Sequence, residues 1–242
     1  PMSGRGAQLF PWTLAKAFLS SPVALRETLR NRSRDLLAKA EVENLEDIPP
    51  TSSLAAEAVA LERLRALNDA CIPVQGSPRS GKYRRLVDLL RAKGVAKNSP
   101  ERVVVFAERV ATLNWLREHL SNDLGLKADQ VAVLHGGLTD VDQQRVVESF
   151  KQSSSPIRVL VTGDIASEGV NLHAQCHELV HFDVPWSLIR IEQRNGRIDR
   201  YGQRTPPQIT ALLLDLSEVD KFDGDLYVLR RLLQREQEAH EQ

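Results

Sequence analysis

Five short apolar runs, rich in β-branched residues, constrain the fold of this chain more than any other feature. They are Arg102–Phe106, Val131–Leu134, Arg158–Val161, Glu178–Phe182 and Thr210–Leu216. A β-branched run such as Arg102–Phe106 is typical of a strand that is buried on both faces of a parallel sheet. Segments with helical periodicity lie between them, as at 109–120 and 140–151. This alternation predicts an α/β fold, in which right-handed crossovers place helices on the faces of a parallel sheet.

The residues before the first run have a helical pattern instead. Ser21 and Pro22 form an N-cap and first-turn pair. A buried stripe is predicted on the helix that follows, formed by Leu25, Leu29, Leu36 and Leu37. Prolines and hydroxyl residues at 41–53 indicate a loop, and a second helical pattern covers 54–70. We therefore predict three regions: a helical region at 1–75, the sheet domain at 76–217, and a C-terminal helix at 218–242 that we expect to be truncated.

The stretch from Ile191 to Gln203 reads IEQRNGRIDRYGQ and is unusually rich in arginine and glycine. In a helix or a tight turn, the three-residue spacing of Arg197 and Arg200 would project both guanidinium groups to one side. Planar, permanently charged groups suit the γ-phosphate of a nucleotide, where charge spreads over several oxygens as the bond breaks. Gly196 allows the backbone to approach a bound group closely. The alternative interpretation is a solvated basic helix or a structural cluster of ion pairs.

Seven residues of this stretch match the pattern Q-R-x-G-R-x-x-R-x-G-Q. They are Gln193, Arg194, Gly196, Arg197, Arg200, Gly202 and Gln203. The pattern resembles the last motif in the second RecA-like lobe of superfamily 2 helicases and translocases, specifically the bacterial Swi/Snf-type branch. The resemblance extends over 80–216 and, loosely, over the first helices, which are similar to helices between the two lobes. It implies that Arg197 and Arg200 are arginine fingers and that Gln193 lies near the ATP cleft.

The same resemblance assigns roles to loops that follow the strands, where the active groups of parallel α/β sheets lie. The residues expected against ATP are Glu168, Gly169 and Asn171, with Asn171 at the ribose. The residues expected to contact nucleic-acid phosphates are His135, Gly136, Thr162 and Gly163. Gly163 stands between Thr162 and Asp164, whereas the family usually has threonine directly before the acid.

A different nucleotide site is suggested by 76–83, which read GSPRSGKY and fit the phosphate-loop pattern G-x-x-x-x-G-K. Tyr83 occupies the position where such a loop needs serine or threonine to hold magnesium. The residues before Gly76 also form a poor strand. A helix that opens at Ser80 or Gly81 explains the segment better, and a phosphate-loop NTPase that uses Lys82 is the alternative.

A metal site is suggested by His173, Cys176, His177 and His181, which lie within one short segment. If 178–182 form a buried strand, His177 and His181 are too far apart to chelate one ion readily. We therefore predict no metal site here, and interpret these residues as packed or hydrogen-bonded side chains.

The overall charge does not indicate a ligand, because 32 basic and 32 acidic residues cancel. Any nucleic-acid surface must therefore be a local patch. Cys71 and Cys176 suggest neither a disulfide framework nor a zinc ribbon, which fits a reducing cytoplasm. No stretch approaches the ~18 apolar residues of a membrane span, so we expect a cytoplasmic protein without membrane contact.

Taken together, the resemblance implies the second lobe of an ATP-dependent translocase or helicase that acts on nucleic acid, with double-stranded DNA as the expected partner. The chain has neither a phosphate loop ending in Lys-Thr nor a D-E-x-H acid pair. We therefore expect the first RecA-like lobe of the same parent chain to hold Mg²⁺ and to supply the phosphate-binding lysine. The full-length protein should then hydrolyse ATP and the isolated chain should not. The alternative is a catalytically inert module that binds nucleic acid or a protein partner.

Overall fold

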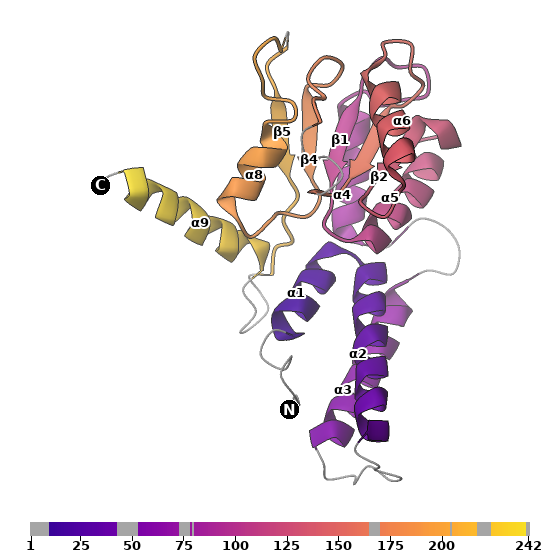
Figure 1. Cartoon of the computed structure of the whole chain (residues 1–242), viewed down its shortest axis with the longest axis vertical. Coiled ribbons are helices and arrows are strands. Elements are labelled where there is room, and N and C mark those ends of the chain that lie inside the picture. The colour runs from indigo at the N-terminus through magenta and orange to yellow at the C-terminus, as the bar shows by residue number, and fades with distance from the viewer. Residues whose placement is uncertain are drawn as a thin grey trace. The chain divides into compact units, whose positions relative to one another are not determined.

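The computed structural model describes residues 10–42, 53–72, 78, 80–164, 170–203, 205–216 and 224–240. The chain divides into two compact units, Pro1–Ser80 and Gly81–Gln242 (Figure 1). Most of the predicted loop at 41–53, and 73–77 around the predicted domain boundary, lie outside the described residues. The domain limits proposed from the sequence therefore stay predictions.

The first unit is helical, as the sequence predicts. Its helices are α1 (Phe10–Ser20), α2 (Pro22–Val42) and α3 (Ser53–Cys71). The hydroxyl oxygen of Ser21 accepts a hydrogen bond from the backbone N–H of Ala24 at 3.2 Å. Pro22 occupies the first helical position, where its missing N–H would have no partner in any case. Helix α2 packs against both α1 and α3.

The core of the first unit is small and apolar, and consists of Phe10, Leu25, Leu29, Leu36 and Leu61. The prediction for Leu37 was wrong, because this side chain is 62% exposed. Leu36 lies three full helical turns beyond Leu25 and so returns to the same face, whereas Leu37 is rotated about 100° further. A buried ion pair joins α2 to α3, with Arg32 Nε 2.7 Å from Glu57 Oε1.

The second unit contains a sheet of five parallel strands in the order β2-β3-β1-β4-β5. The strands are β1 (Val103–Phe106), β2 (Val131–Leu134), β3 (Val159–Thr162), β4 (Glu178–His181) and β5 (Gln208–Ala211). All five coincide with or overlap the predicted runs, and the α/β fold with an added helical segment is confirmed.

The last strand differs from its prediction, because it begins at Gln208 and ends at Ala211 rather than covering 210–216. β5 pairs only with β4, and Ala211 stands opposite His181, the last residue of that strand. Leu212 makes one further backbone bond to the His181 carbonyl oxygen, at 2.9 Å. The length of the neighbouring strand thus ends β5, whatever the apolarity of the residues that follow.

Helices cover both faces of the sheet (Figure 1). They are α4 (Gly81–Ala92), α5 (Val110–Asp123), α6 (Asp140–Lys151) and α8 (Leu188–Asn195), with a 3-10 turn η1 (Ala128–Gln130) and a later helix α9 (Asp225–His240). The connection from β1 to β2 runs along the sheet in the opposite direction to the later ones. Right-handed crossovers therefore place α5 on one face and α6 and α8 on the other.

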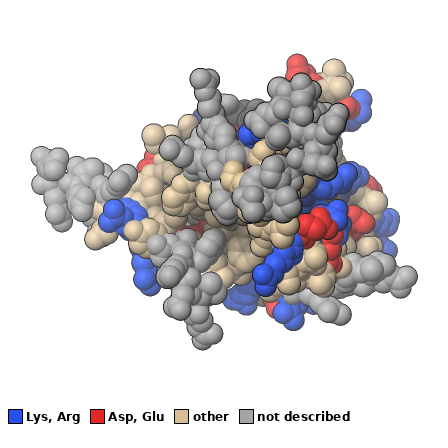
Figure 2. All heavy atoms as spheres, turned by 90° about the horizontal axis from the view of Figure 1, so that it is seen from below, with Lys and Arg blue, Asp and Glu red and all other residues tan. Residues whose placement is uncertain are grey.

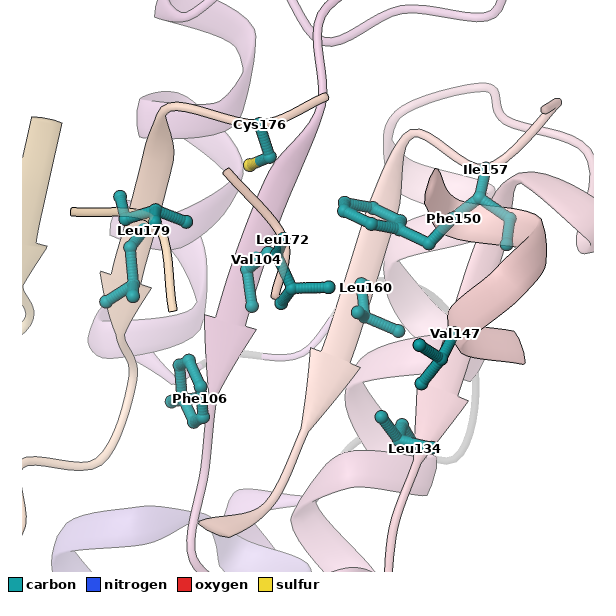
Figure 3. Packing of buried hydrophobic residues seen from close by; sticks show 11 residues of the cluster. Val104, Phe106, Leu134, Val147, Phe150, Ile157, Leu160, Leu172, Cys176 and Leu179 are labelled. Atoms are coloured by element: carbon teal, nitrogen blue, oxygen red, sulfur yellow. The ribbon is translucent and has the colours of Figure 1, made fainter. Parts of the chain in front are cut away.

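Two packing clusters hold these helices to the sheet. Between α4 and α5, the rings of Tyr83 and Trp115 lie 5.1 Å apart, and the Tyr83 hydroxyl donates to Asp123 at 2.6 Å. On the opposite face, Val147 and Phe150 of α6 pack over the strands with Leu160 (Figure 3). The predicted burial on both faces is observed for β1 to β4, whereas three of the four residues of β5 are exposed.

No helix in the described ranges is both long enough and apolar enough to cross a membrane. On the face that Figure 2 presents, basic and acidic side chains are interspersed. This distribution agrees with the equal totals of the two charges in the sequence.

Candidate nucleotide and nucleic-acid site

The carboxyl ends of the strands lie along one edge of the sheet. Thr162 of β3 pairs with Leu134 of β2 and with Phe106 of β1, and Phe106 pairs with His181 of β4. The loops that follow these residues therefore emerge side by side. The predicted nucleic-acid residues follow β2 and β3 at this edge, whereas Arg197 and Arg200 come after α8.

The residues predicted to contact nucleic acid are brought together by the pairing of β2 with β3. The Gly163 N–H donates to the Leu134 carbonyl oxygen at 3.2 Å, directly before His135. His135 Nδ1 in turn accepts the N–H of Gly137 at 3.0 Å, which shapes the turn after β2. The Thr162 side chain is buried, and its hydroxyl donates to the Gly163 carbonyl oxygen at 3.1 Å. Its hydroxyl is thus engaged within the protein, and only backbone groups and His135 are left to meet a phosphate.

The arginine-rich segment begins as helix α8 and continues as a series of turns. Arg197 N–H donates to the Arg194 carbonyl oxygen at 3.0 Å, and Gln203 N–H donates to that of Arg200 at 3.0 Å. Gly202 has a φ of 92°, a conformation that a residue with a side chain would rarely adopt. The Gln203 side chain then fixes the last turn by donating to the carbonyl oxygens of Cys176 and Ile198, each at 3.0 Å.

Two of the predicted nucleotide contacts meet in this arrangement. The Arg200 guanidinium donates a hydrogen bond to Asn171 Oδ1, although the two residues are 29 positions apart. The backbone supports this contact, because Leu172 N–H donates to the Arg197 carbonyl oxygen at 3.0 Å. Arg200 and Asn171 are both exposed, and Arg197 is half-buried.

The remaining predicted residues are not brought into this contact. Gln193 is exposed on α8, and no described contact joins it to Asn171 or Arg200. Glu168 and Gly169 lie outside the described residues. Their assignment to ATP stays a prediction.

Arg194 belongs to the same motif but is buried, with 2% of its surface exposed. Its Nε and Nη2 atoms donate to the two carboxylate oxygens of Asp164, at 2.5 and 3.1 Å. Nη1 donates to the Asp183 carbonyl oxygen at 2.5 Å, and the guanidinium carbon lies 5.1 Å from the centroid of the Phe106 ring. Arg194 matches the motif in the sequence, but the motif alone predicted no role for this residue. Asp164, which follows the third strand, was the residue in the sequence that could have indicated a buried partner for Arg194.

His181 completes the surroundings of this guanidinium. Burial lowers the pKa of His181 to about 4, so the ring is neutral at physiological pH. Its Nε2 lies 2.9 Å from Asn195 Oδ1, and its Nδ1 lies 3.5 Å from Arg194 Nη1. A neutral ring that donates from Nε2 leaves the Nδ1 lone pair facing the arginine. α8 is thus held to β4 through two consecutive residues.

Lys82 does not lie in a phosphate-binding loop. It is in the first turn of α4, and its Nζ is 3.1 Å from Asp183 Oδ1 and 4.7 Å from the centroid of the Phe182 ring. The other carboxylate oxygen of Asp183 accepts the Glu108 N–H at 2.9 Å. The ammonium charge is balanced inside the protein, so the geometry does not support the phosphate-loop alternative.

Two of the four residues considered as metal ligands, Cys176 and His181, are engaged in other contacts. Cys176 Sγ lies 3.2 Å from the carbonyl oxygens of both Arg102 and Glu178. Burial raises the pKa of the Cys176 thiol to about 12, which keeps it protonated. Across the described residues, no three His, Cys, Asp or Glu side chains form a group that could hold a metal ion.

Residues 81–202 match the family described as the helicase conserved C-terminal domain. The match covers half of the chain and includes the whole edge described above, and the chain belongs to this family. The predicted membership in superfamily 2, as a C-terminal RecA-like lobe, is confirmed.

The relatives with curated names include the RNA polymerase-associated protein RapA of Vibrio cholerae and that of Yersinia enterocolitica. Each is 35% identical over 118 residues, which cover 49% of this chain and 12% of the relative. The chain thus matches about an eighth of the length of these proteins. Among solved structures, the C-terminal part of the Fun30 ATPase domain has a TM-score of 0.51 at 18% identity, covering 89% of this chain and 82% of that one. This likeness shows a shared fold.

Proposed function

We propose that this chain is the second lobe of an ATP-dependent translocase or helicase that moves on nucleic acid. In this role Arg197 and Arg200 stabilise the charge that develops on the γ-phosphoryl group during ATP hydrolysis. The chain's own sheet edge contributes part of the track for double-stranded DNA. Membership in the helicase C-terminal family supports the general class.

The observation that carries the proposal is the contact of Arg200 with Asn171. The family resemblance assigned both residues to the nucleotide, one to the phosphate and one to the ribose, and a hydrogen bond joins their side chains. Both side chains are exposed, so a nucleotide can reach them. The amide of Asn171 is neutral and does not offset the charge of the Arg200 guanidinium, as a carboxylate partner would.

The proposed chemistry is an attack of water on the γ-phosphorus and cleavage of the bond to the β-phosphate oxygen, which yields ADP and phosphate. Arg197 and Arg200 would donate hydrogen bonds to the oxygens on which negative charge grows. Such fingers are worth about 10³–10⁵ in rate when the remainder of the site is assembled. Neither residue supplies the base or the nucleophile.

Magnesium does not fit the acids of this edge. Asp164 is bonded to Arg194 and Asp183 to Lys82, so the charge of both carboxylates is already neutralised by a cation of the protein. We propose that the first RecA-like lobe holds Mg²⁺ and the phosphate-binding lysine. That lobe is then the essential partner of this chain.

The nucleic-acid track is proposed at the adjacent ends of β2 and β3. His135 and the backbone around Gly136 and Gly163 lie on adjacent loops, and we expect their contacts to be with phosphates rather than bases. Binding should therefore depend on salt and not on sequence.

ATP turnover by the isolated chain, compared with that of the chain joined to a first lobe, tests the proposal. The isolated chain should hydrolyse ATP at no more than background, and the joined protein should do so in a manner stimulated by duplex DNA. Efficient turnover by the isolated chain would contradict the proposal. A joined protein that binds DNA without hydrolysis would favour the inert binding module.

A further inference from the structure

The three arginines of the motif have different environments. Arg200 is exposed and Arg197 half-buried, whereas Arg194 is enclosed by residues from three strands. It is therefore out of reach of a nucleotide. Its guanidinium makes four contacts, two with the Asp164 carboxylate, one with the Asp183 carbonyl oxygen and one with His181.

The partner acid occupies a special place in the chain. Asp164 directly follows Thr162 and Gly163, the residues assigned to the nucleic-acid track. It also precedes the segment that leads to Asn171 on the nucleotide side. Its carboxylate is 29% exposed and lies 3.9 Å from Arg190, one turn earlier on α8. Asp164 thus lies between the two groups of proposed ligand residues in the sequence, and its carboxylate contacts α8.

We propose that Arg194 and Asp164 form a positioning pair that sets the placement of the two exposed arginines. α8 ends at Asn195, so the segment with Arg197 and Arg200 continues directly from the residue that Asp164 holds. The pair is bidentate, which fixes the orientation of the guanidinium as well as its distance. A shift of the loop after β3 would therefore be passed to α8 rather than absorbed.

The first test needs no ligand and does not rest on the proposed function. In the 242-residue chain, Asp164→Asn should make the amides of Arg197, Ile198 and Leu172 exchange with solvent at least about tenfold faster, because their hydrogen bonds depend on this segment. The amides of β1 should exchange as in the wild type. Unchanged exchange of the three amides would overturn the inference.

The chain offers a matched control in the first unit. Arg32 and Glu57 form a second buried arginine–carboxylate pair, and Arg32 also lies 5.1 Å from an aromatic centroid, that of Phe10. Glu57→Gln should lower the melting temperature without accelerating exchange after α8. If both variants accelerate exchange throughout the chain, the pair contributes only general stability and the inference fails.

The second test rests on the proposed function and uses the two-lobe protein. Asp164→Asn should lower the DNA-stimulated kcat about 10²-fold, the effect expected of a small misplacement of catalytic groups, with little change in KM for ATP. Asp164→Glu keeps the charge and should recover part of that loss. Arg194→Lys, which keeps the charge without the fork, is the second variant if Asp164→Asn does not fold, and it should lose kcat similarly.

The two tests separate the two ideas. Faster exchange in Asp164→Asn, together with a wild-type two-lobe protein that lacks DNA-stimulated turnover, would leave the positioning pair standing and refute the proposed function. Normal turnover in a folded Asp164→Asn protein, equal to that of Glu57→Gln, would overturn the pair as a positioning device.

Discussion

Lys82 and Asp183 form a buried ion pair across 101 positions of the sequence, with Nζ 3.1 Å from Oδ1. The side chains are 3% and 8% exposed, so neither charge is hydrated by bulk water. The pair joins the start of α4 to the turn that follows β4. The Lys82–Asp183 pair therefore stabilises the sheet unit, and its contribution to the free energy of unfolding can be measured.

Replacement of Lys82 by methionine should lower the free energy of unfolding by about 3–5 kcal/mol, since it leaves the Asp183 carboxylate buried without its cation. Urea denaturation measures this change. Arg84→Met, at an exposed position of the same helix, is the control and should remain close to wild type. A loss below about 1 kcal/mol would mean that solvent or another group stabilises Asp183.

Replacement of Arg200 or Arg197 by alanine in the two-lobe protein should reduce ATP turnover by about 10³-fold or more. ATP binding should change little, because the interaction strengthens in the transition state. Lysine should restore little, because it lacks the planar fork that reaches two oxygens. Steady-state turnover and nucleotide titration measure both effects, with Asp199→Ala as an exposed control between the two arginines. A lower melting temperature with normal turnover per folded molecule would refute the finger assignment.

Binding of the isolated chain to duplex DNA should weaken steadily as salt is raised and should not depend on sequence. His135→Asp places a negative charge at the proposed track while retaining an acceptor for the Gly137 N–H. It should weaken binding about fivefold, the effect of roughly 1 kcal/mol for one charge contact. Asn98→Asp makes the same charge change before β1, at the opposite edge, and should have little effect. Fluorescence anisotropy with labelled duplex DNA measures the binding of both variants. Equal weakening by His135→Asp and Asn98→Asp would mean that the track does not lie at His135.

Stability should fall as the pH drops from about 6.5 to about 4 because of His181. Its pKa is lowered from 6.5 to about 4 in the folded protein, so the unfolded chain binds a proton more tightly in this range. The loss of stability from this group amounts to about 3 kcal/mol at most. It is complete once the pH lies below the pKa of His181 in the folded protein. His181→Gln retains both a donor and an acceptor but does not titrate, and should flatten this part of the stability curve relative to wild type and to His135→Gln. Identical pH profiles for His181→Gln and wild type would contradict this account.

Local sequence was sufficient to predict much of the architecture. The β-branched runs at 103–106, 131–134 and 159–162, and the start of α2 at Ser21 and Pro22, depend on backbone propensity and on hydrogen bonds between near neighbours. The arginine motif was also recognisable, because its residue spacing is a local property. These features need no knowledge of the strand order.

Tertiary structure alone decided what each charged residue does. Three arginines share one motif, but only the order β2-β3-β1-β4-β5 brings Asp164 and Phe106 around Arg194 and leaves Arg200 at Asn171. The same order gives Lys82 its partner and ends β5 where β4 ends. A charge is buried or exposed according to partners that are distant in sequence, because desolvation and pairing depend on what the folded chain places within a few ångströms. The sequence determined which groups were available, and the packing of the sheet determined which of them were left for a ligand.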